Sequence, residues 1–311
     1  MLCRSARRWR LGFPGIAAFR ERLAQVLEMD TETRLEGTQA HVTIGPRRPF
    51  VLIGERINPS GKKRLATSLA QGDLSLVREE ALAQAQAGAQ VIDVNVAAEG
   101  VDELTLLPLA VQAAAEVVTM PICIDTTDAK ALAAALAVCP GRPLVNSVTG
   151  EDASLERVLP LVRERGCAVI GLCMDHAGIP AGANRRLEIA EKILRAAEKQ
   201  RIPREDVVID PLAMTVGADS AAGVAALEAT RLITSQLGAN TTLGGSNVSF
   251  GLPERSLINR SFLPMAMAAG LTSAIVDPLD VEIRKTVAAC DLLMGHDEYA
   301  MRFLQRSRAG W

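Results

Sequence analysis

Aromatic and histidine residues are scarce in this chain of 311 residues. Only 3% of the residues are Phe, Trp or Tyr, whereas 49% are hydrophobic, so we expect a core built mainly from aliphatic side chains. The three histidines, His41, His176 and His296, are scattered, and a zinc site with three protein ligands cannot be assembled from them alone. The six cysteines form no CxxC pair. This cysteine usage is typical of a protein from the reducing cytoplasm.

A charge excess, long apolar segments and common catalytic motifs are also missing. The formal net charge is −2, which gives no general reason to expect nucleic acid as a partner. No apolar stretch reaches the roughly 18–20 uncharged residues that span a bilayer, so we expect no membrane segment. The sequence has neither a GxSxG turn nor a Walker loop, which argues against a serine hydrolase and a P-loop enzyme.

What the sequence does contain is an alternation repeated eight times, in which a short apolar run with polar residues near its end precedes an amphipathic stretch. Runs rich in Val, Ile and Leu are typical of parallel strands buried on both faces, and the intervening stretches are long enough for crossover helices. Eight such units predict an α/β fold, a closed (β/α)8 TIM barrel. The predicted strands are 51–58, 91–96, 122–126, 143–148, 168–175, 207–213, 241–247 and 273–278. The predicted helices are 75–88, 103–118, 128–138, 152–165, 185–200, 220–237, 255–269 and 280–294.

The segments that flank the barrel are less regular. We expect an N-terminal extension at 1–49, the barrel at 50–300 and a C-terminal tail at 301–311. The first 22 residues hold six arginines and one acid; this could mimic a transit peptide, but a poorly ordered tail or an extended start-codon assignment explains it better. A helix is predicted from Ile16 to Glu28. Segments 41–45 and 50–54 predict a hairpin that plugs the amino end of the barrel.

Two local features stand out from the regular pattern. Pro264 lies inside a predicted helix and removes a backbone donor there, so we expect a kink or two short helices. The connection at 59–73 is longer and more basic than the others because it contains Lys62, Lys63 and Arg64. It could steer an anionic ligand toward the barrel, although a solvated charge run is the commoner explanation.

Polar side chains gather at the carboxyl ends of the predicted strands, where TIM barrels place their active sites. Each one taken alone could be a turn residue, because Asp and Asn bind nearby backbone amides. A whole ring of them is harder to explain in this way, since a buried unpaired polar atom costs about 1–3 kcal/mol. The ring has no lysine for Schiff-base chemistry, and its donors and acceptors suit a flat heterocycle such as a pterin. Its members are Glu55, Asn58, Asp93, Asn95, Asp125, Asp128, Asn146, Asp175, Asp210, Ser246, Asn247 and Asp277.

Seven short segments of the sequence together resemble one enzyme family, the methyltetrahydrofolate:corrinoid-protein methyltransferases, including those that serve corrinoid/iron-sulfur proteins. These are pterin-binding barrels related to the folate domain of cobalamin-dependent methionine synthase and to dihydropteroate synthase. The resemblance implies a dihydropteroate-synthase-like barrel that forms a homodimer. It also implies methyl transfer between 5-methyltetrahydrofolate and the Co(I) corrinoid of a separate corrinoid protein. The segments are IGERIN (53–58), VIDVNV (91–96), IDTTD (124–128), VNSV (145–148), IDPL (209–212), LGGSNVSFGLP (243–253) and LINRSFL (257–263).

The resemblance also assigns site residues. Asp125 and Asn146 are similar to the pterin-holding pair of the family, and Asp210 is similar to the carboxylate that grips the pyrimidine edge. Gly244 and Ser246 are similar to close neighbours of the pterin. Asn247 is similar to the residue that binds the methyl-bearing nitrogen, which makes it the predicted catalytic residue. Additional candidates from the matched motifs are Glu55, Asn58, Asp93 and Asn95.

The corrinoid must be supplied by a partner, because the chain has no DxHxxG corrinoid-binding motif; we expect no metal of its own. Two alternatives stay open. Dihydropteroate synthase would need a basic residue after strand seven and an Arg-His pair after strand eight, but these loops read SNVSFGLPER and VDPLDVEIRK. A non-catalytic barrel that binds or presents a folate is the second alternative, since the sequence does not measure turnover.

Overall fold

The computed structural model describes residues 31–311, which form one compact unit. Seven parallel strands make up its main sheet, in the order β8-β7-β6-β5-β4-β3-β9. Neighbours in the sheet are consecutive in the chain except where β9 joins β3. The strands are β3 (Val51–Ile57), β4 (Val91–Val94), β5 (Ile122–Asp125), β6 (Leu144–Thr149), β7 (Ala168–Leu172), β8 (Val207–Asp210) and β9 (Ser273–Val276).

The segment predicted as the seventh barrel strand closes this sheet without forming a regular strand. It makes two single-residue parallel pairings, Thr241 with Ile209 and Gly244 with Ile275. The Thr242 amide donates to the Ile209 carbonyl at 2.9 Å, and the Ile275 amide donates to the Leu243 carbonyl at 2.8 Å. The irregularity has a local cause, because the Thr241 amide donates to the Thr272 hydroxyl instead of to a neighbouring strand. The predicted TIM barrel is therefore confirmed.

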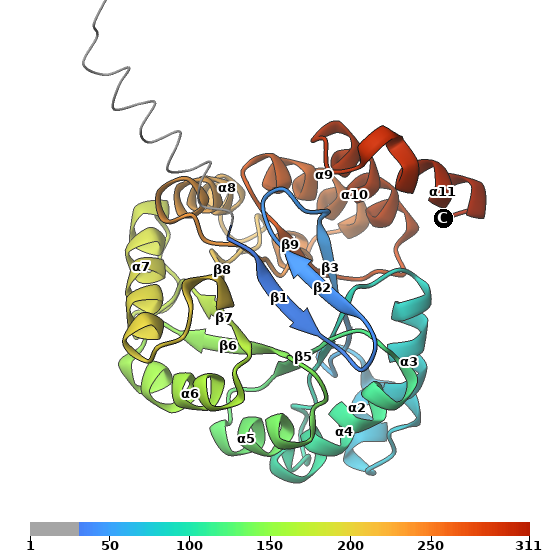
Figure 1. Ribbon diagram of the computed structural model, residues 1–311, viewed down its shortest axis with the longest axis vertical. Coiled ribbons are helices and arrows are strands. Elements are labelled where there is room, and N and C mark those ends of the chain that lie inside the picture. Colours follow the sequence, from blue (N-terminus) through green and yellow to red (C-terminus); the bar gives the residue numbers. More distant parts are fainter. Residues whose placement is uncertain (1–30) are drawn as a thin grey trace, which may run out of the picture. The chain divides into compact units, whose positions relative to one another are not determined.

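Helices surround the strands, as Figure 1 shows. All eight predicted helices are present to within a few residues, and α2 and α11 are additional. The last predicted turn of α8 is a π-helix, Ile233–Leu237. The α-helices are α2 (Lys63–Ala70), α3 (Ser75–Gln86), α4 (Glu103–Val117), α5 (Ala129–Val138), α6 (Asp152–Arg165), α7 (Ala183–Lys199), α8 (Ala222–Leu232), α9 (Arg255–Ala268), α10 (Val281–Leu293) and α11 (Met301–Ala309).

The break expected at Pro264 is absent, because α9 runs without interruption through it. A proline removes one backbone donor, and the carbonyl that loses its partner belongs to Arg260, which is only half-buried. Phe262 and Leu263 on one side of the proline and Ala266 on the other are buried in the core. This packing keeps the two halves of α9 together as one continuous helix.

The predicted hairpin exists, but its strands are different. β1 (Thr33–Glu36) pairs antiparallel with β2 (His41–Ile44), whereas segment 50–54 belongs to the barrel. The expected pairing of 41–45 with 50–54 is wrong because β3 already pairs with β4 on one edge and with β9 on the other. The segment therefore has no free edge, and β2 pairs with the preceding strand instead.

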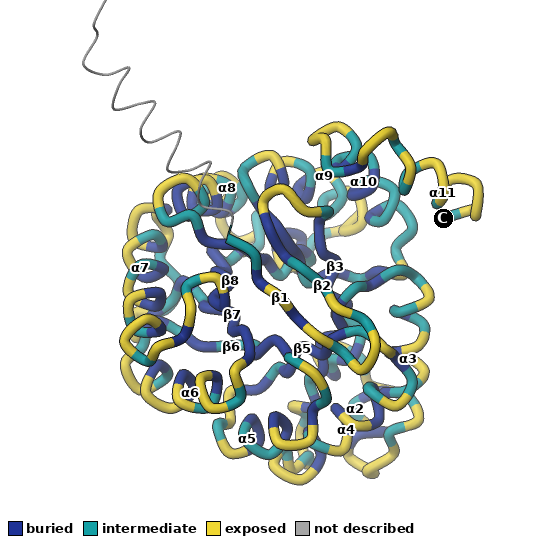
Figure 2. Tube along the Cα trace, viewed as in Figure 1, coloured by how far each residue is buried: buried dark blue, intermediate teal, exposed yellow. Residues whose placement is uncertain are grey.

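The hairpin lies across the amino end of the barrel strands (Figure 1). Leu35 and Ile44 are fully buried and pack with barrel residues such as Val51 and Val91; Figure 2 shows buried segments of the hairpin in dark blue. The Asn240 side chain donates to the carbonyl oxygen of Ile44 at 3.0 Å. The hairpin thus plugs this end, and the opposite end carries the polar strand termini.

The basic tail and the helix predicted for 16–28 lie outside the described residues. From residue 31 onward, the structure contains no helix with the length and apolar character needed to cross a membrane.

Candidate active site

Two amide–carboxylate pairs interlock across the ends of β4, β5 and β6. The Asn95 side chain donates to Asp125 at 2.9 Å, and the Asn146 side chain donates to Asp93 at 3.3 Å. Asp125 and Asn146 also face each other in the register of β5 and β6. Four of the candidate residues from the sequence are therefore brought together at the carboxyl end of the barrel.

Burial changes the protonation of the two acids in this group. It raises the pKa of Asp93 well above the ordinary value, and the nearby charge of Asp125 adds to the rise. Burial also raises the pKa of Asp125 to about 6, although the hydrogen bond from Asn95 opposes the change. Asp93 is only 2% exposed. Both carboxyls therefore hold a proton more tightly than an exposed aspartate does.

Asp210 ends β8 and is a third buried acid. One of its carboxylate oxygens accepts a hydrogen bond from the Leu212 amide at 2.7 Å. Burial raises its pKa to about 7, whereas the amides of Leu212 and Gly244 and the charge of Arg186 oppose the rise. The carboxylate is thus half-ionised near neutral pH and gains from any ligand that donates hydrogen bonds to it.

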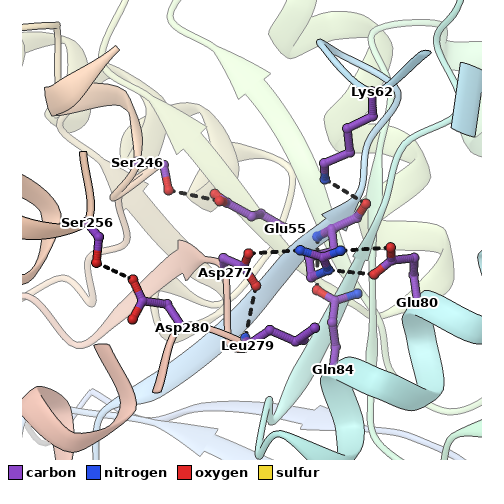
Figure 3. Close-up of polar contacts among 10 residues, drawn as sticks. Glu55, Lys62, Glu80, Gln84, Ser246, Ser256, Asp277, Leu279 and Asp280 are labelled. Atoms are coloured by element: carbon purple, nitrogen blue, oxygen red, sulfur yellow. Dashed lines mark hydrogen bonds and ion pairs between the residues drawn. The ribbon is translucent and has the colours of Figure 1, made fainter. Parts of the chain in front are cut away.

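Glu55 and Ser246 connect the first barrel strand to the segment that closes the barrel. The Ser246 hydroxyl donates to Glu55 at 2.9 Å, and Figure 3 shows the two side chains directed toward each other. Burial raises the pKa of Glu55, with a smaller contribution from the charge of Asp277. This pair adds a carboxyl of raised pKa next to the loop that carries Asn247.

Asn247 begins the short 3-10 helix η3 (Asn247–Ser249), and its side chain is exposed. The backbone amide of Asn247 donates to the carbonyl of Gly244 at 3.1 Å. A Cβ atom at Gly244 would lie 2.6 Å from the Asn247 side-chain nitrogen, closer than real Cβ contacts come. Glycine at 244 therefore leaves room for the side-chain amide of Asn247, which stays accessible to a ligand.

Other strand-end residues have local partners that explain their presence. The Asn58 side chain accepts from the Ser60 amide at 2.9 Å, which closes a turn. Asp175 accepts from the Ala177 amide at 3.0 Å and from Arg185 at 2.9 Å. Their contacts to backbone amides are those of ordinary turn residues, so local structure alone accounts for Asn58 and Asp175 at these positions, and the site role predicted for Asn58 stays a prediction.

Two arginines that the sequence did not single out support the loops of the site. Arg186 is 1% exposed and donates to the Leu212 carbonyl at 2.7 Å, two residues beyond Asp210. Arg255 donates to the Ser246 carbonyl at 2.8 Å and to the Ser249 hydroxyl at 3.1 Å. Since both bind mostly backbone oxygens, no residue pattern marks them; only their places shortly after motif residues could have drawn attention.

A third such arginine, Arg56, lies within the IGERIN segment. It makes a two-pronged ion pair with Glu80, at 2.5 and 2.9 Å, and a further ion pair with Asp277 at 2.9 Å. Figure 3 shows Glu80 and Asp277 on opposite sides of this contact. The network accounts for Asp277, another member of the predicted ring, as an ion-pair partner.

Known proteins similar to this chain include methyl-transferring enzymes. The methylcorrinoid:tetrahydrofolate methyltransferase of Eubacterium limosum is 31% identical over 269 residues, which are 84% of this chain and 97% of that protein. Methionine synthase of Mycobacterium tuberculosis is 31% identical over 239 residues, 73% of this chain but 20% of that protein. The chain thus spans about one fifth of the methionine synthase.

Solved structures with a similar fold include two dihydropteroate synthases. The enzyme of Yersinia pestis has a TM-score of 0.65 at 16% identity, covering 85% of this chain and all of that one. The enzyme of Xanthomonas albilineans has a TM-score of 0.63 at 20% identity, covering 87% of this chain and 100% of that one. At such identities the likeness concerns the fold alone.

The sequence profile of one family covers most of the barrel. It is described as pterin binding enzyme and matches residues 54–277, a span that begins in β3, ends just after β9 and includes every pterin contact expected from the sequence. Together with the match to nearly the whole Eubacterium limosum protein, it leads to one conclusion: the chain belongs to the pterin-binding enzyme family.

Proposed function

We propose that this protein is a methyltransferase that moves a methyl group between nitrogen 5 of methyltetrahydrofolate and the corrinoid of a separate protein. The observation that carries the proposal is the similarity to nearly the full length of an enzyme whose name specifies both methyl carriers. In that name the methylcorrinoid is the methyl donor and tetrahydrofolate is the acceptor. The same residues serve both directions, because they act on a shared transition state. The proposal includes a homodimer, which sedimentation of the purified protein would test.

The buried acids and amides fit the polar edge of a pterin. A pterin presents a 2-amino group and a ring N–H, which together match the two oxygens of a carboxylate such as Asp210. Its carbonyl oxygen needs a donor, and Asn146 in β6 carries a side-chain amide. Asp125 supplies a further acceptor. The raised pKa of Asp210, caused by burial, favours a ligand that donates to it.

Asn247 is proposed to act on the nitrogen that carries the methyl group. The bound corrinoid supplies a Co(I) nucleophile, or a cobalt-bound methyl group in the reverse direction. The amine nitrogen is a poor leaving group, so the enzyme must stabilise the negative charge that develops there. A hydrogen bond donated by Asn247 strengthens as this charge develops and so favours the transition state over the bound substrate. Nitrogen 5 then takes up a proton that comes from solvent, directly or through water held by the surrounding acids.

Replacement of Asn247 tests the proposal. For Asn247→Ala we expect kcat to fall about 100- to 1,000-fold, the usual cost of losing one such donor, while the Kd for methyltetrahydrofolate changes little. Cobalt absorbance would follow the reaction with a corrinoid protein, and calorimetry would give the Kd. Asn184→Ala is the matched control, because Asn184 is exposed in the first turn of α7. Near-normal turnover of Asn247→Ala would contradict the assignment, and formation of dihydropteroate from p-aminobenzoate would support the synthase instead.

A further inference from the structure

Two cavities border the carboxyl end of the barrel. One lies between α2 and α3, measures about 510 Å³ and is lined by residues that include Lys63, Arg64 and Thr67. The other lies between α6 and α7, measures about 440 Å³ and is lined in part by Arg185 and Lys192. Their volumes are similar, but they differ in whether the cations of their lining form ion pairs.

In the α6–α7 cavity the protein neutralises its own cations. Arg185 forms ion pairs with Asp175 at 2.9 Å and with Glu188 at 2.7 Å. Lys192 forms an ion pair with Asp152 at 2.8 Å. An anion entering this cavity would have to compete with these carboxylates, so the cavity is unsuited to an anionic ligand.

In the α2–α3 cavity the cations are unpaired. Lys63 and Arg64 are exposed, and within residues 31–311 neither has an ion pair or a side-chain hydrogen bond. The nearby Asp73 carboxylate is occupied, because the amide and the hydroxyl of Ser75 both donate to it at 2.9 Å. Glu79 is the other acid of the lining, and it lies on the α3 wall. The α2 wall thus presents two cations together with the hydroxyl of Thr67.

The same connection reaches the candidate active site. Lys62 directly precedes these cations, and its ammonium group donates to the Arg56 carbonyl at 2.8 Å. Arg56 follows Glu55, which binds Ser246 in the site. Figure 3 shows Lys62 extending toward this strand end. The α2–α3 cavity therefore borders the barrel end at β3, where a ligand held at the strand ends could extend a tail into it.

From these contacts we propose that the α2–α3 cavity binds the glutamyl carboxylates of the folate substrate. The inference rests on the proposed function. A folate carries its pterin at one end and glutamate at the other, and each further glutamate of a polyglutamyl tail adds a carboxylate. Lys63 and Arg64 supply the matching charges, so the enzyme binds polyglutamyl folates more tightly than the monoglutamate.

The test compares methyltetrahydrofolate with one and with three glutamates by calorimetry. An exposed ion pair contributes about 1.5- to 5-fold in affinity, so two cations give the triglutamate an advantage of about 2- to 25-fold in the unmodified protein. We expect Lys63→Ala/Arg64→Ala to abolish this advantage. The advantage should also shrink at high salt, which screens exposed charges. Lys192→Ala, the matched control in the α6–α7 cavity, should keep the advantage, as should Lys63→Arg/Arg64→Lys.

Several results would overturn the inference. Equal affinity for both folates in the unmodified protein is one, and an advantage that survives in the double alanine variant is another. If that variant raised only the KM for the corrinoid protein, Lys63 and Arg64 would serve the protein partner instead. In each case monoglutamate binding and turnover would leave the proposed function intact. Failure of the unmodified protein to bind either folate would overturn the proposed function as well.

Discussion

The burial that suits Asp210 to its proposed ligand-binding role also has a cost in stability. Burial raises its pKa to about 7 from an ordinary value of 3.8, so the folded state holds this proton more tightly than the unfolded state does. The resulting stabilisation is fully present below about pH 4 and is lost as the pH rises through 7. For Asp210→Asn we expect the free energy of unfolding, relative to wild type, to rise between pH 4 and 8 by up to about 4 kcal/mol.

Pterin binding should respond to Asp210 in the opposite direction. In the proposed complex the ionised carboxylate accepts both hydrogen bonds of the pterin edge, whereas a protonated acid or an amide accepts fewer. We therefore expect Asp210→Asn to weaken folate binding at pH 8 while it stabilises the protein. Urea denaturation at several pH values checks the change in stability, and calorimetry at pH 8 checks folate binding. A stability difference independent of pH would show that Asp210 does not titrate as a buried acid.

Gly244 provides a second test at a single residue. An alanine Cβ would lie 2.6 Å from the Asn247 side-chain nitrogen, so the amide must move away from its place. We expect Gly244→Ala to lower kcat by about 10- to 1,000-fold, with the fold retained, because the loss is that of one oriented donor. The double variant with Asn247→Ala should be hardly slower than Asn247→Ala alone. Independent, multiplicative losses in this cycle would contradict the coupling of the two residues.

At the scale of elements, the turn that carries Asn247 depends on α9. Arg255 is the first residue of that helix and donates to Ser246 and Ser249 on either side of Asn247. Arg255→Gln should loosen the turn and lower kcat about tenfold, with a change in stability of about 0.5–1.5 kcal/mol, the net value of a typical hydrogen bond. Steady-state kinetics and thermal unfolding check this. Arg255→Lys should recover part of kcat; a large loss of folding stability in Arg255→Gln would indicate a merely structural role.

The helices and strands were predicted correctly where the hydrophobic pattern determines them. The predictions were wrong where contacts with other segments determine the structure. Alternation of apolar strands and amphipathic helices indicated all eight helices and the barrel, since both depend on burial. The hairpin partner was wrong because the pattern of 50–54 does not reveal that both of its edges are occupied. The division into two short helices expected as one outcome at Pro264 was wrong, because buried residues on both sides of the proline keep α9 as one helix. Helix α2 was missed within a segment read as a basic loop.

The candidate site, too, could be predicted only in part from the sequence. Strand ends indicated which polar residues lie at the mouth of the barrel, since the carboxyl ends of parallel strands converge there. The pairing of Asn95 with Asp125 and of Asn146 with Asp93 depends on side-chain directions that the sequence does not specify. Arg186 donates to the Leu212 carbonyl, 26 residues later, and Arg255 donates to the Ser246 carbonyl across the turn before α9. Contacts of that kind leave no local pattern, so they require the structure.

At the scale of the whole molecule, stability and chemistry are placed at opposite ends of the barrel. The β1–β2 hairpin covers the amino end with the fully buried Leu35 and Ile44, while the acids and amides of the site lie at the carboxyl end. A change in the plug should therefore reduce folding stability without reaching the site. This separation makes it possible to vary one property and leave the other unchanged.

Leu35→Ala tests that separation. Leu35 is 0% exposed, and removing a buried leucine side chain costs about 2–5 kcal/mol because apolar contact is lost and a cavity remains. We expect such a loss in the free energy of unfolding by urea, with kcat and folate Kd near wild type at 20–25 °C, where the variant stays folded. Leu293→Ala is the matched control, since Leu293 is 85% exposed and its truncation should change stability by less than about 0.5 kcal/mol. A comparably small cost for Leu35→Ala would mean that the hairpin adds little to the barrel. A fall in kcat while the variant remains folded would mean that the two ends of the barrel are coupled, because the plug would then control the geometry of the strand ends.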